Sequence, residues 1–198
     1  MEVFHTPEDY QAFLKLMGEA CERLPMRVLA YCLMPDHFHL VVWPRKDGDL
    51  SVWMQWLATS HVRRYHRDYQ SSGHVWQGRF KSFPVQSDAH LWKVCRYVER
   101  NPLRANLVKR AQAWEWSSLR WRGKEGGPFF LTEGPTARPK GWVKVVNRPQ
   151  REAEVKALRR CVQRGRPCGS ETWQRRIAKR LGLECSLNPR GRPRRSEK

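Results

Sequence analysis

The sequence predicts an α+β fold: a short antiparallel β-hairpin with amphipathic helices before and after it. The first observation is the stretch Tyr31–Trp43, YCLMPDHFHLVVW, which has the pattern strand, tight turn, strand. Such a short connection favours an antiparallel pair. The second is the helical spacing of apolar side chains over residues 7–22 and again over residues 91–98. The third is the length of 198 residues, which accommodates one ordinary domain and an extension.

The first helix is expected over residues 7–22, with Thr6 as its N-cap, Pro7 in the first turn and Asp9 three residues after the cap. A strand is expected over Met26–Leu33, and a turn at residues 34–36 joins it to a second strand, His37–Trp43.

The second strand sets His37 and His39 two residues apart, so both imidazoles share one face while Phe38 points to the other. Two adjacent imidazoles with Asp36 beside them suit a divalent metal ion. The alternative is a strand with two half-buried histidines that are hydrogen-bonded to their neighbours. The pair alone leaves both interpretations open.

Asp49 is expected to cap a second helix that runs to about Tyr69. One side of this helix is basic, and such a face is either solvated or in contact with a phosphate backbone; it carries Arg63, Arg64, His66 and Arg67. The run His74–Gln86 then has the pattern of a strand, with Gly78 at a bulge.

A third helix follows a cap at Ser87 or Asp88, and its apolar stripe is Leu91, Val94, Cys95 and Val98. At 100° per residue, Tyr97 lies roughly 110° from the middle of that stripe. Asn101 lies four residues further on the same flank, and Pro102 stops or kinks the helix. The pattern therefore predicts an outward-facing tyrosine rather than a core residue.

The charge of the chain is strongly positive and unevenly distributed. Lys+Arg 38 against Asp+Glu 19 give a formal net charge of +19, which predicts a polyanionic partner, nucleic acid before an anionic membrane. Residues 1–137 contribute +5 (19 basic, 14 acidic) and residues 138–198 contribute +14 (19 basic, 5 acidic).

The six cysteines form no CxxC pair, and no signal peptide or membrane-crossing run is visible, so we expect a reduced, intracellular protein.

The last third of the chain is expected to be an extension. We divide the sequence into residues 1–121, a Gly/Pro-rich linker over 122–149, and a basic, partly helical extension over 150–198. Helices are expected over about 150–162 and 173–181, the latter ended by Gly182. The tail Arg190–Arg194 is similar to an AT-hook core, with non-specific phosphate contact as the alternative.

The same protein would then contain a metal ion bound by imidazoles and a tyrosine on a helix. A metal ion can polarise a phosphate, and a tyrosine hydroxyl can then attack phosphorus. Because the ordinary pKa of tyrosine is near 10, nearby cations must assist. The third helix supplies four of them: Lys93, Arg96, Arg100 and Arg104.

The chain contains the three blocks YCLMPDHFHLVV, HVWQGRFKS and RYVERNPLRANLV. Together they resemble the single-tyrosine HUH transposases, above all the REP-associated tyrosine transposases. The resemblance continues through RGRPCGSETWQRRIAKRLGLECSLNPRGRPRR and so covers nearly the whole chain. It implies a ferredoxin-like antiparallel sheet with helices on one face, and a bacterial, cytoplasmic protein associated with the nucleoid.

The resemblance also implies a site and a substrate. His37 and His39 would bind Mg²⁺ or Mn²⁺, Asn101 would be the third ligand, and Tyr97 would attack a single-stranded DNA phosphodiester to give a 5′-phosphotyrosine and a free 3′-hydroxyl. The substrates would be palindromic DNA hairpins with a single-stranded guide sequence nearby. Membrane binding is not expected, and the oligomeric state stays open, a homodimer included.

The basic residues expected to contact DNA are Arg63, Arg64, Arg67, Arg79, Lys81, Lys93, Arg96, Arg100, Arg104, Arg190, Arg192 and Arg194.

The chain departs from the family at its start, where relatives have a strand and a Gly/Arg/Asn-rich loop before the first helix. Met1–His5 can supply only a stub of that strand. Two other functions therefore stay open. One is a hairpin-binding protein without catalysis. The other is a metal-dependent hydrolase, for which the sequence offers no paired carboxylates.

Overall fold

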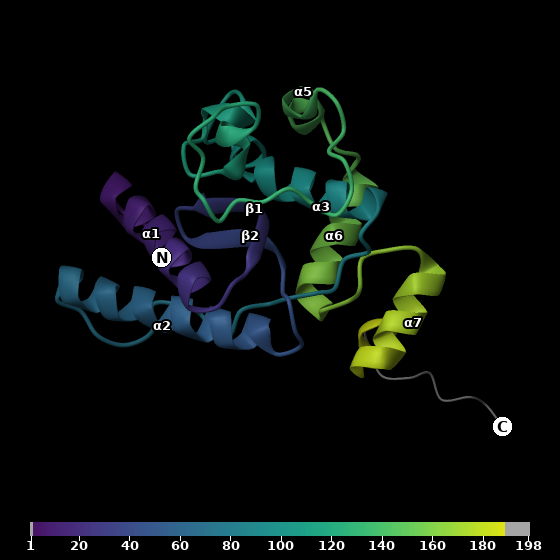
Figure 1. Ribbon diagram of the computed structural model, residues 1–198, viewed down its shortest axis with the longest axis horizontal. Helices are drawn as coiled ribbons and strands as arrows, with labels where there is room; N and C mark the ends of the chain where they lie inside the picture. The colour runs from purple at the N-terminus through teal and green to yellow at the C-terminus, as the bar shows by residue number, and fades with distance from the viewer. Residues whose placement is uncertain (1, 189–198) are drawn as a thin grey trace. The chain divides into compact units, whose positions relative to one another are not determined.

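The computed structural model describes residues 2–188, which form two compact units. The first comprises residues up to Phe80 together with Trp92–Gln150, and the second comprises Lys81–Leu91 together with the chain from Arg151 onward. Residues 122–149, the expected linker, lie in the first unit. The AT-hook-like motif at 190–194 lies outside the described residues. The expected mixed α/β class is confirmed: the described residues form helices and one antiparallel pair of strands (Figure 1).

Helix α1 spans Pro7–Arg23, close to the expected range. Thr6 is its N-cap, and Asp9 closes a capping box by accepting hydrogen bonds from the backbone N–H groups of Thr6 (3.0 Å) and His5 (2.9 Å). The side chain of Asp9 is buried and also accepts from the Tyr69 hydroxyl at 2.6 Å. The cap therefore also joins the start of α1 to the second helix of the chain.

The hairpin consists of β1 (Arg27–Met34) and β2 (His37–Trp43), as expected to within one residue. The register pairs Cys32 with His39 and Met34 with His37. Directly opposed residues point to the same face of a sheet. The two histidines therefore share their face with Cys32 and Met34.

Irregular segments cover the second edge of β1. Leu33 N–H donates to the carbonyl of Trp116 (2.9 Å), Tyr31 N–H donates to Ser118 Oγ (3.0 Å), and the carbonyl of Val28 accepts from Thr132 N–H (2.8 Å). The sheet has two strands in the described part of the chain. Loop residues from much later in the sequence thus supply the partners that a third strand would give to β1.

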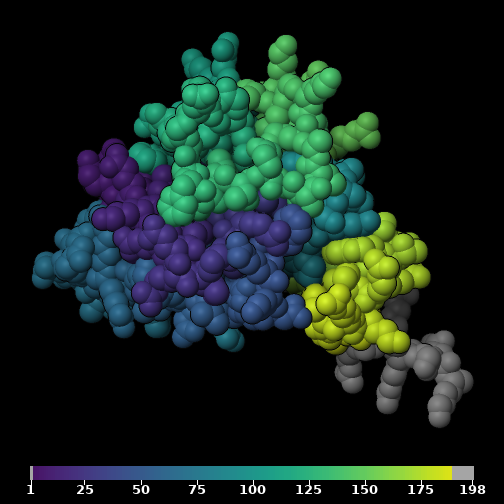
Figure 2. All heavy atoms as spheres, viewed as in Figure 1, coloured from purple at the N-terminus to yellow at the C-terminus, as the bar shows by residue number. Residues whose placement is uncertain are grey.

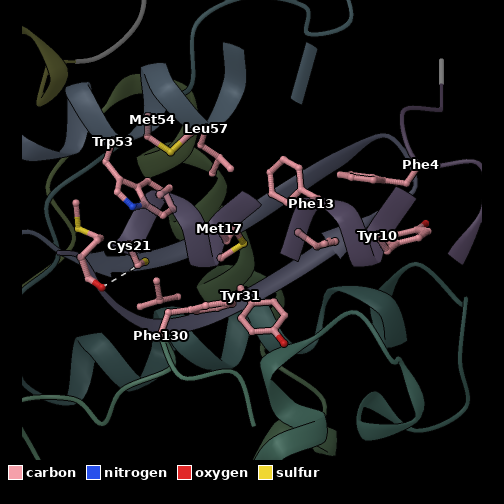
Figure 3. Packing of buried hydrophobic residues seen from close by; sticks show 14 of the residues in the cluster. Phe4, Tyr10, Phe13, Met17, Cys21, Tyr31, Trp53, Met54, Leu57 and Phe130 are labelled. Atoms are coloured by element: carbon pink, nitrogen blue, oxygen red, sulfur yellow. Dashed lines mark hydrogen bonds between the residues drawn. The ribbon is translucent and has the colours of Figure 1, made fainter. Parts of the chain in front are cut away.

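Helix α2 (Asp49–Tyr69) matches the expected range, and its buried residues include Trp53, Leu57 and His61. They pack with Phe13 and Met17 of α1 in the main hydrophobic core (Figure 3). The core continues onto the face of the hairpin that carries Phe38, whose ring lies 5.1 Å from that of Phe13.

Helix α3 (Ala89–Glu99) has the predicted buried stripe at residues 91, 94, 95 and 98, and the Asp88 side chain accepts from the backbone N–H of His90 (2.8 Å). Pro102 interrupts the helix as expected, and α4 spans Asn101–Arg104. The side chains of neighbouring β2 residues contact different helices: Phe38 contacts α1, and His39 contacts Tyr97 of α3. Helices of the first unit therefore contact both faces of the hairpin.

The expected strand over His74–Gln86 is wrong. The segment is irregular apart from an isolated bridge at Val85. Gly73 (φ 95°) and Gly78 (φ 151°) interrupt an extended path. Trp76 points instead into the core, where its ring lies 5.2 Å from that of Phe38.

The rest of the first unit contains short helices: η1 (Ala111–Ala113), η2 (Ser118–Trp121) and α5 (Trp142–Asn147). Of these, α5 lies within residues 122–149, where the sequence indicates a linker. Phe130 and Trp142 within this region are buried. Apolar burial, rather than local periodicity, organises this part of the chain.

The second unit contains α6 (Glu152–Arg164), α7 (Glu171–Leu181) and η3 (Glu184–Ser186). Gly165 and Gly182 end the two α-helices with positive φ angles of 63° and 64°, and Gly182 has the expected capping role. Val85 forms a parallel bridge with Cys168 inside this unit. None of the helices within residues 2–188 combines the length and the apolar character needed to cross a bilayer.

Candidate functional site

The two imidazoles of β2 converge, as the alternation along a strand predicts. Their Nε2 atoms lie 3.1 Å apart and their ring centroids 4.8 Å apart, at 89°. Two ligand nitrogens at about 2.1 Å from one metal ion and at right angles to it would lie about 3 Å apart. The spacing therefore fits two adjacent ligands of one divalent cation.

Asp36 orients the outer histidine. Its Oδ1 lies 2.6 Å from His37 Nδ1, which leaves His37 Nε2 directed at its partner ring. Partial burial acts to raise the pKa of Asp36, but the hydrogen bond and the charge of His37 lower it overall. A carboxylate behind a ligating histidine fixes the tautomer and makes the free nitrogen a better ligand.

The inner histidine is held neutral. Burial, followed by the charges of His37 and Arg104, lowers the pKa of His39 to about 3. At neutral pH its imidazole therefore keeps a lone pair on nitrogen, which is the form that binds metal ions.

Tyr97 lies directly beside this pair. Its ring centroid is 5.9 Å from that of His39, with the planes at 80°. The side chain is off the apolar stripe of α3, as expected, but it is only 8% exposed because His39 and Arg104 cover it. Within the described part of the chain its hydroxyl has no hydrogen-bond partner. The ring is thus buried, with His39 and Arg104 against it, and it lies outside the main hydrophobic cluster of α1, α2 and the hairpin.

Asn101 lies close to Tyr97, but its amide is engaged. Nδ2 donates to the carbonyl of Val98 (3.3 Å), and Oδ1 accepts from the Arg104 guanidinium (2.7 Å). A guanidinium on that oxygen competes with a metal ion for the same lone pairs. Among residues 2–188, no cluster of three or more His, Cys, Asp or Glu side chains could hold a metal ion. Among the described residues, the two imidazoles are therefore the protein groups positioned to bind one metal ion.

Arg104, which the sequence marks only as one of four cations on the third helix, connects these residues. Its Cζ lies 4.2 Å from the centroid of the Tyr97 ring, in cation–π contact. The guanidinium also donates to the carbonyl of Tyr97 (3.3 Å) and to Oε1 of Gln150 (2.9 Å). The spacing of seven residues from Tyr97 would indicate a shared helix face, but the interruption before Pro102 removes that regularity.

Glu99 anchors the helix that carries Tyr97, and pattern reasoning missed it. The side chain is fully buried and accepts from Ser118 Oγ (2.6 Å), Arg122 Nε (3.2 Å) and Trp142 Nε1 (2.5 Å). Ser118 in turn bonds to the backbone of Tyr31 in β1. This network couples the position of α3 to that of the hairpin.

The cations expected to contact DNA differ in exposure and in their partners. Five are exposed: Arg63, Arg67, Arg79, Lys81 and Lys93. Others have structural partners: Arg64 pairs with Asp9 (3.3 Å) and Asp68 (3.1 Å), while Arg96 and Arg100 donate to backbone carbonyls over residues 146–149. Arg190, Arg192 and Arg194 lie outside the described residues.

The chain is similar to known DNA-processing proteins. Residues 1–101 match the family described as IS200-like transposases. Over 118 residues the chain is 28% identical to a protein of Haemophilus influenzae named "Putative REP-associated tyrosine transposase", an alignment that covers 54% of this chain. The chain spans just under two thirds (66%) of the length of that relative. No solved structure matches the chain.

Proposed function

The chain belongs to the family of IS200-like transposases, and on that premise we propose that it cuts and rejoins single-stranded DNA through a covalent bond to Tyr97. The family implies an enzyme that acts on DNA. The chemistry at Tyr97, the hairpin form of the substrate and the participation of Mg²⁺ or Mn²⁺ are the proposal.

In the proposed step the Tyr97 hydroxyl oxygen attacks phosphorus. A new bond forms between phosphorus and the phenolic oxygen, the bond between phosphorus and the 3′ oxygen breaks, and the phenolic proton ends on the departing 3′-hydroxyl. The products are a 5′-phosphotyrosine and a free 3′ end. One phosphoester replaces another, so the reverse attack by a 3′-hydroxyl rejoins the strand without an external energy source.

His37 and His39 would hold the divalent ion, with Asp36 behind His37. Once bound there, the ion would polarise the phosphate and offset the charge that develops on its oxygens. The two imidazoles fit an ion that takes its remaining ligands from water and from the DNA. Imidazole ligands favour softer ions than Mg²⁺, so we expect Mn²⁺ to bind more tightly in vitro.

Asn101 is the proposed third ligand, and the contacts of Arg104 bear on how it would act. Its Oδ1 would reach an ion only after the Arg104 guanidinium moves away from it. An arriving phosphate offers that guanidinium a stronger, bidentate partner than a neutral amide. DNA binding would then free Asn101 Oδ1 and place a cation beside the scissile phosphate in one movement.

The observation that carries the proposal is the contact between Tyr97 and an imidazole of the converging pair. The test is incubation with a labelled single-stranded hairpin and Mn²⁺, followed by denaturing electrophoresis. A covalent protein–DNA adduct is expected, and Tyr97→Phe should abolish it while Tyr65→Phe, a tyrosine on α2, should not. An adduct that survives in Tyr97→Phe would refute this nucleophile.

One observation favours a second candidate, a hairpin-binding protein without catalysis. Tyr97 is almost fully buried, and Arg104 occupies the oxygen of Asn101. This candidate predicts salt-sensitive DNA binding that His37→Ala and Tyr97→Phe leave unchanged, and no adduct with any of the variants.

A further inference from the structure

Helix α7 of the second unit has an exposed face whose central positions are basic. Arg175, Arg176, Lys179 and Arg180 recur one turn apart on this face. Glu171 and Thr172 at its start and Leu181 at its end are also exposed. The intervening positions, which include Ile177 and Ala178, are half-buried or buried. The residues of α7 belong to the yellow part of Figure 2.

Most of this charge has no partner. Arg175 pairs with Glu171 at 2.5 Å, one turn earlier. Within residues 2–188, Arg176, Lys179 and Arg180 form no ion pair and donate no side-chain hydrogen bond. On α6, by comparison, Lys156 pairs with Glu152 at 2.7 Å. Three unpaired cations along one helix face repel one another, and an anionic partner would relieve that cost.

The start of α7 is rigidly held. Ser170 N–H donates to Gln86 Oε1 (2.8 Å), and Arg166 donates to Gln174 Oε1 (2.9 Å). Gly169 is packed so tightly that a Cβ atom there would lie 2.5 Å from the Trp173 ring. Because the helix is already ordered, a ligand that binds its exposed face does not pay to fold it.

The chemistry of the face favours double-stranded over single-stranded DNA. Proteins that grip single strands without sequence preference stack the bases on aromatic side chains, and the exposed positions of α7 include no aromatic residue. An 11-residue helix is about 16 Å long, and the major groove, about 12 Å wide and flanked by phosphates, admits such a helix.

We infer that the basic face of α7, defined as Arg175, Arg176, Lys179 and Arg180, binds the double-stranded DNA of the substrate, such as the stem of a hairpin. This inference rests on the proposed function for the identity of the substrate. Duplex binding would then belong to the second unit, and the chemistry at Tyr97 to the first.

The test measures binding of the full chain to a fluorescent duplex of about 20 base pairs and to an unstructured thymidine oligonucleotide of the same length, over a range of salt concentrations. The test variant is the triple change Arg176→Gln, Lys179→Gln, Arg180→Gln. The charge-matched control is Lys109→Gln, Lys124→Gln, Lys140→Gln, three exposed lysines of the first unit.

For the α7 variant we expect duplex affinity to fall at least ~10-fold and the slope of log K against log salt to decrease by about 2 to 3, because each lost phosphate contact contributes about 0.9. Binding of the thymidine oligonucleotide should change no more than in the control. Equal losses on the two DNAs, or duplex binding equal to that of the control, would overturn the inference.

Two further measurements separate this inference from other causes. The charge-preserving variant Arg176→Lys, Lys179→Arg, Arg180→Lys should keep duplex binding, which distinguishes lost contacts from lost folding; its failure to bind would contradict the electrostatic account. The second measurement is the adduct assay with the labelled single-stranded hairpin and Mn²⁺, carried out on the wild-type chain. A protein that forms no adduct but shows the α7 effect would refute the proposed chemistry and leave the α7 surface intact.

Discussion

The Tyr97 ring meets the His39 ring edge to face, with centroids 5.9 Å apart and planes at 80°. These residues are 58 positions apart in the chain and come from a helix and a strand. Their contact brings a potential nucleophile to a pair of imidazoles whose Nε2 atoms are 3.1 Å apart. The proposed attack of Tyr97 on a metal-bound phosphate requires this contact.

Asp36→Asn should weaken Mn²⁺ binding about 10- to 100-fold, because the carboxylate that orients His37 is removed while both imidazoles remain. Isothermal titration of the metal-free protein with MnCl₂ measures this. Asp47→Asn, which changes an exposed loop carboxylate, is the control and should titrate like the wild type. Unchanged affinity in Asp36→Asn would show that this carboxylate has no part in metal binding.

Arg104→Met should lower the free energy of unfolding by about 1–3 kcal/mol, because it removes the cation–π contact with Tyr97 and hydrogen bonds to Asn101 and Gln150. Urea denaturation provides the value. Arg110→Met changes an exposed arginine close by in the sequence and should cost much less. Equal costs for the two variants would mean that the Arg104 contacts do not persist in solution.

Glu99→Ala should be severely destabilising, by about 3–5 kcal/mol, because it removes the buried carboxylate that pairs with Arg122. It also removes the acceptor of the hydrogen bonds from Ser118 and Trp142. Thermal and urea denaturation report this loss. Glu125→Ala, at an exposed position, is the comparison. A mild effect in Glu99→Ala would contradict the role of this network in anchoring α3.

The free energy of unfolding should fall as the pH is lowered from 6.5 towards 4. Burial, followed by the charge of Arg64, lowers the pKa of His61 to about 4, so in this range the unfolded chain binds a proton that the folded protein excludes. Linkage gives a loss on the order of 2 kcal/mol at pH 5 from this group, and His39 adds to it in the same direction.

His61→Phe keeps a ring among Phe4, Phe13 and Trp76 and should flatten part of that pH profile. Urea denaturation at pH 7 and pH 5 compares the two proteins. If the variant loses as much stability as the wild type between these values, His61 does not titrate as the structure indicates.

Local patterns predicted the parts of the site that depend on one element. The alternation in β2 places His37 and His39 together, and the apolar stripe of α3 sets Tyr97 on a different flank. Both follow from periodicities of two and 3.6 residues, which are properties of a single segment.

Long-range partners were not predictable in this way. The edge of β1 pairs with residues near 117 and 131, which have no strand pattern of their own, and the expected strand at 74–86 finds no partner there. Arg96, Arg100 and Arg104 were interpreted alike as cations on one helix. In the structure, however, the first two bind backbone carbonyls, and the third holds Tyr97 and Asn101. Charge along a sequence does not reveal which partner the tertiary fold will supply.

The most direct test of the central claim is to locate the covalent bond itself. The wild-type protein is incubated with a single-stranded hairpin and Mn²⁺, digested with nuclease and trypsin, and examined by tandem mass spectrometry. We predict that a residual 5′-nucleotide is attached at Tyr97, in the tryptic peptide Tyr97–Arg100 or in Val94–Arg100 where the bond after Arg96 stays uncut. Attachment at any other residue, or the absence of an adduct under conditions in which the DNA is cleaved, would contradict the account.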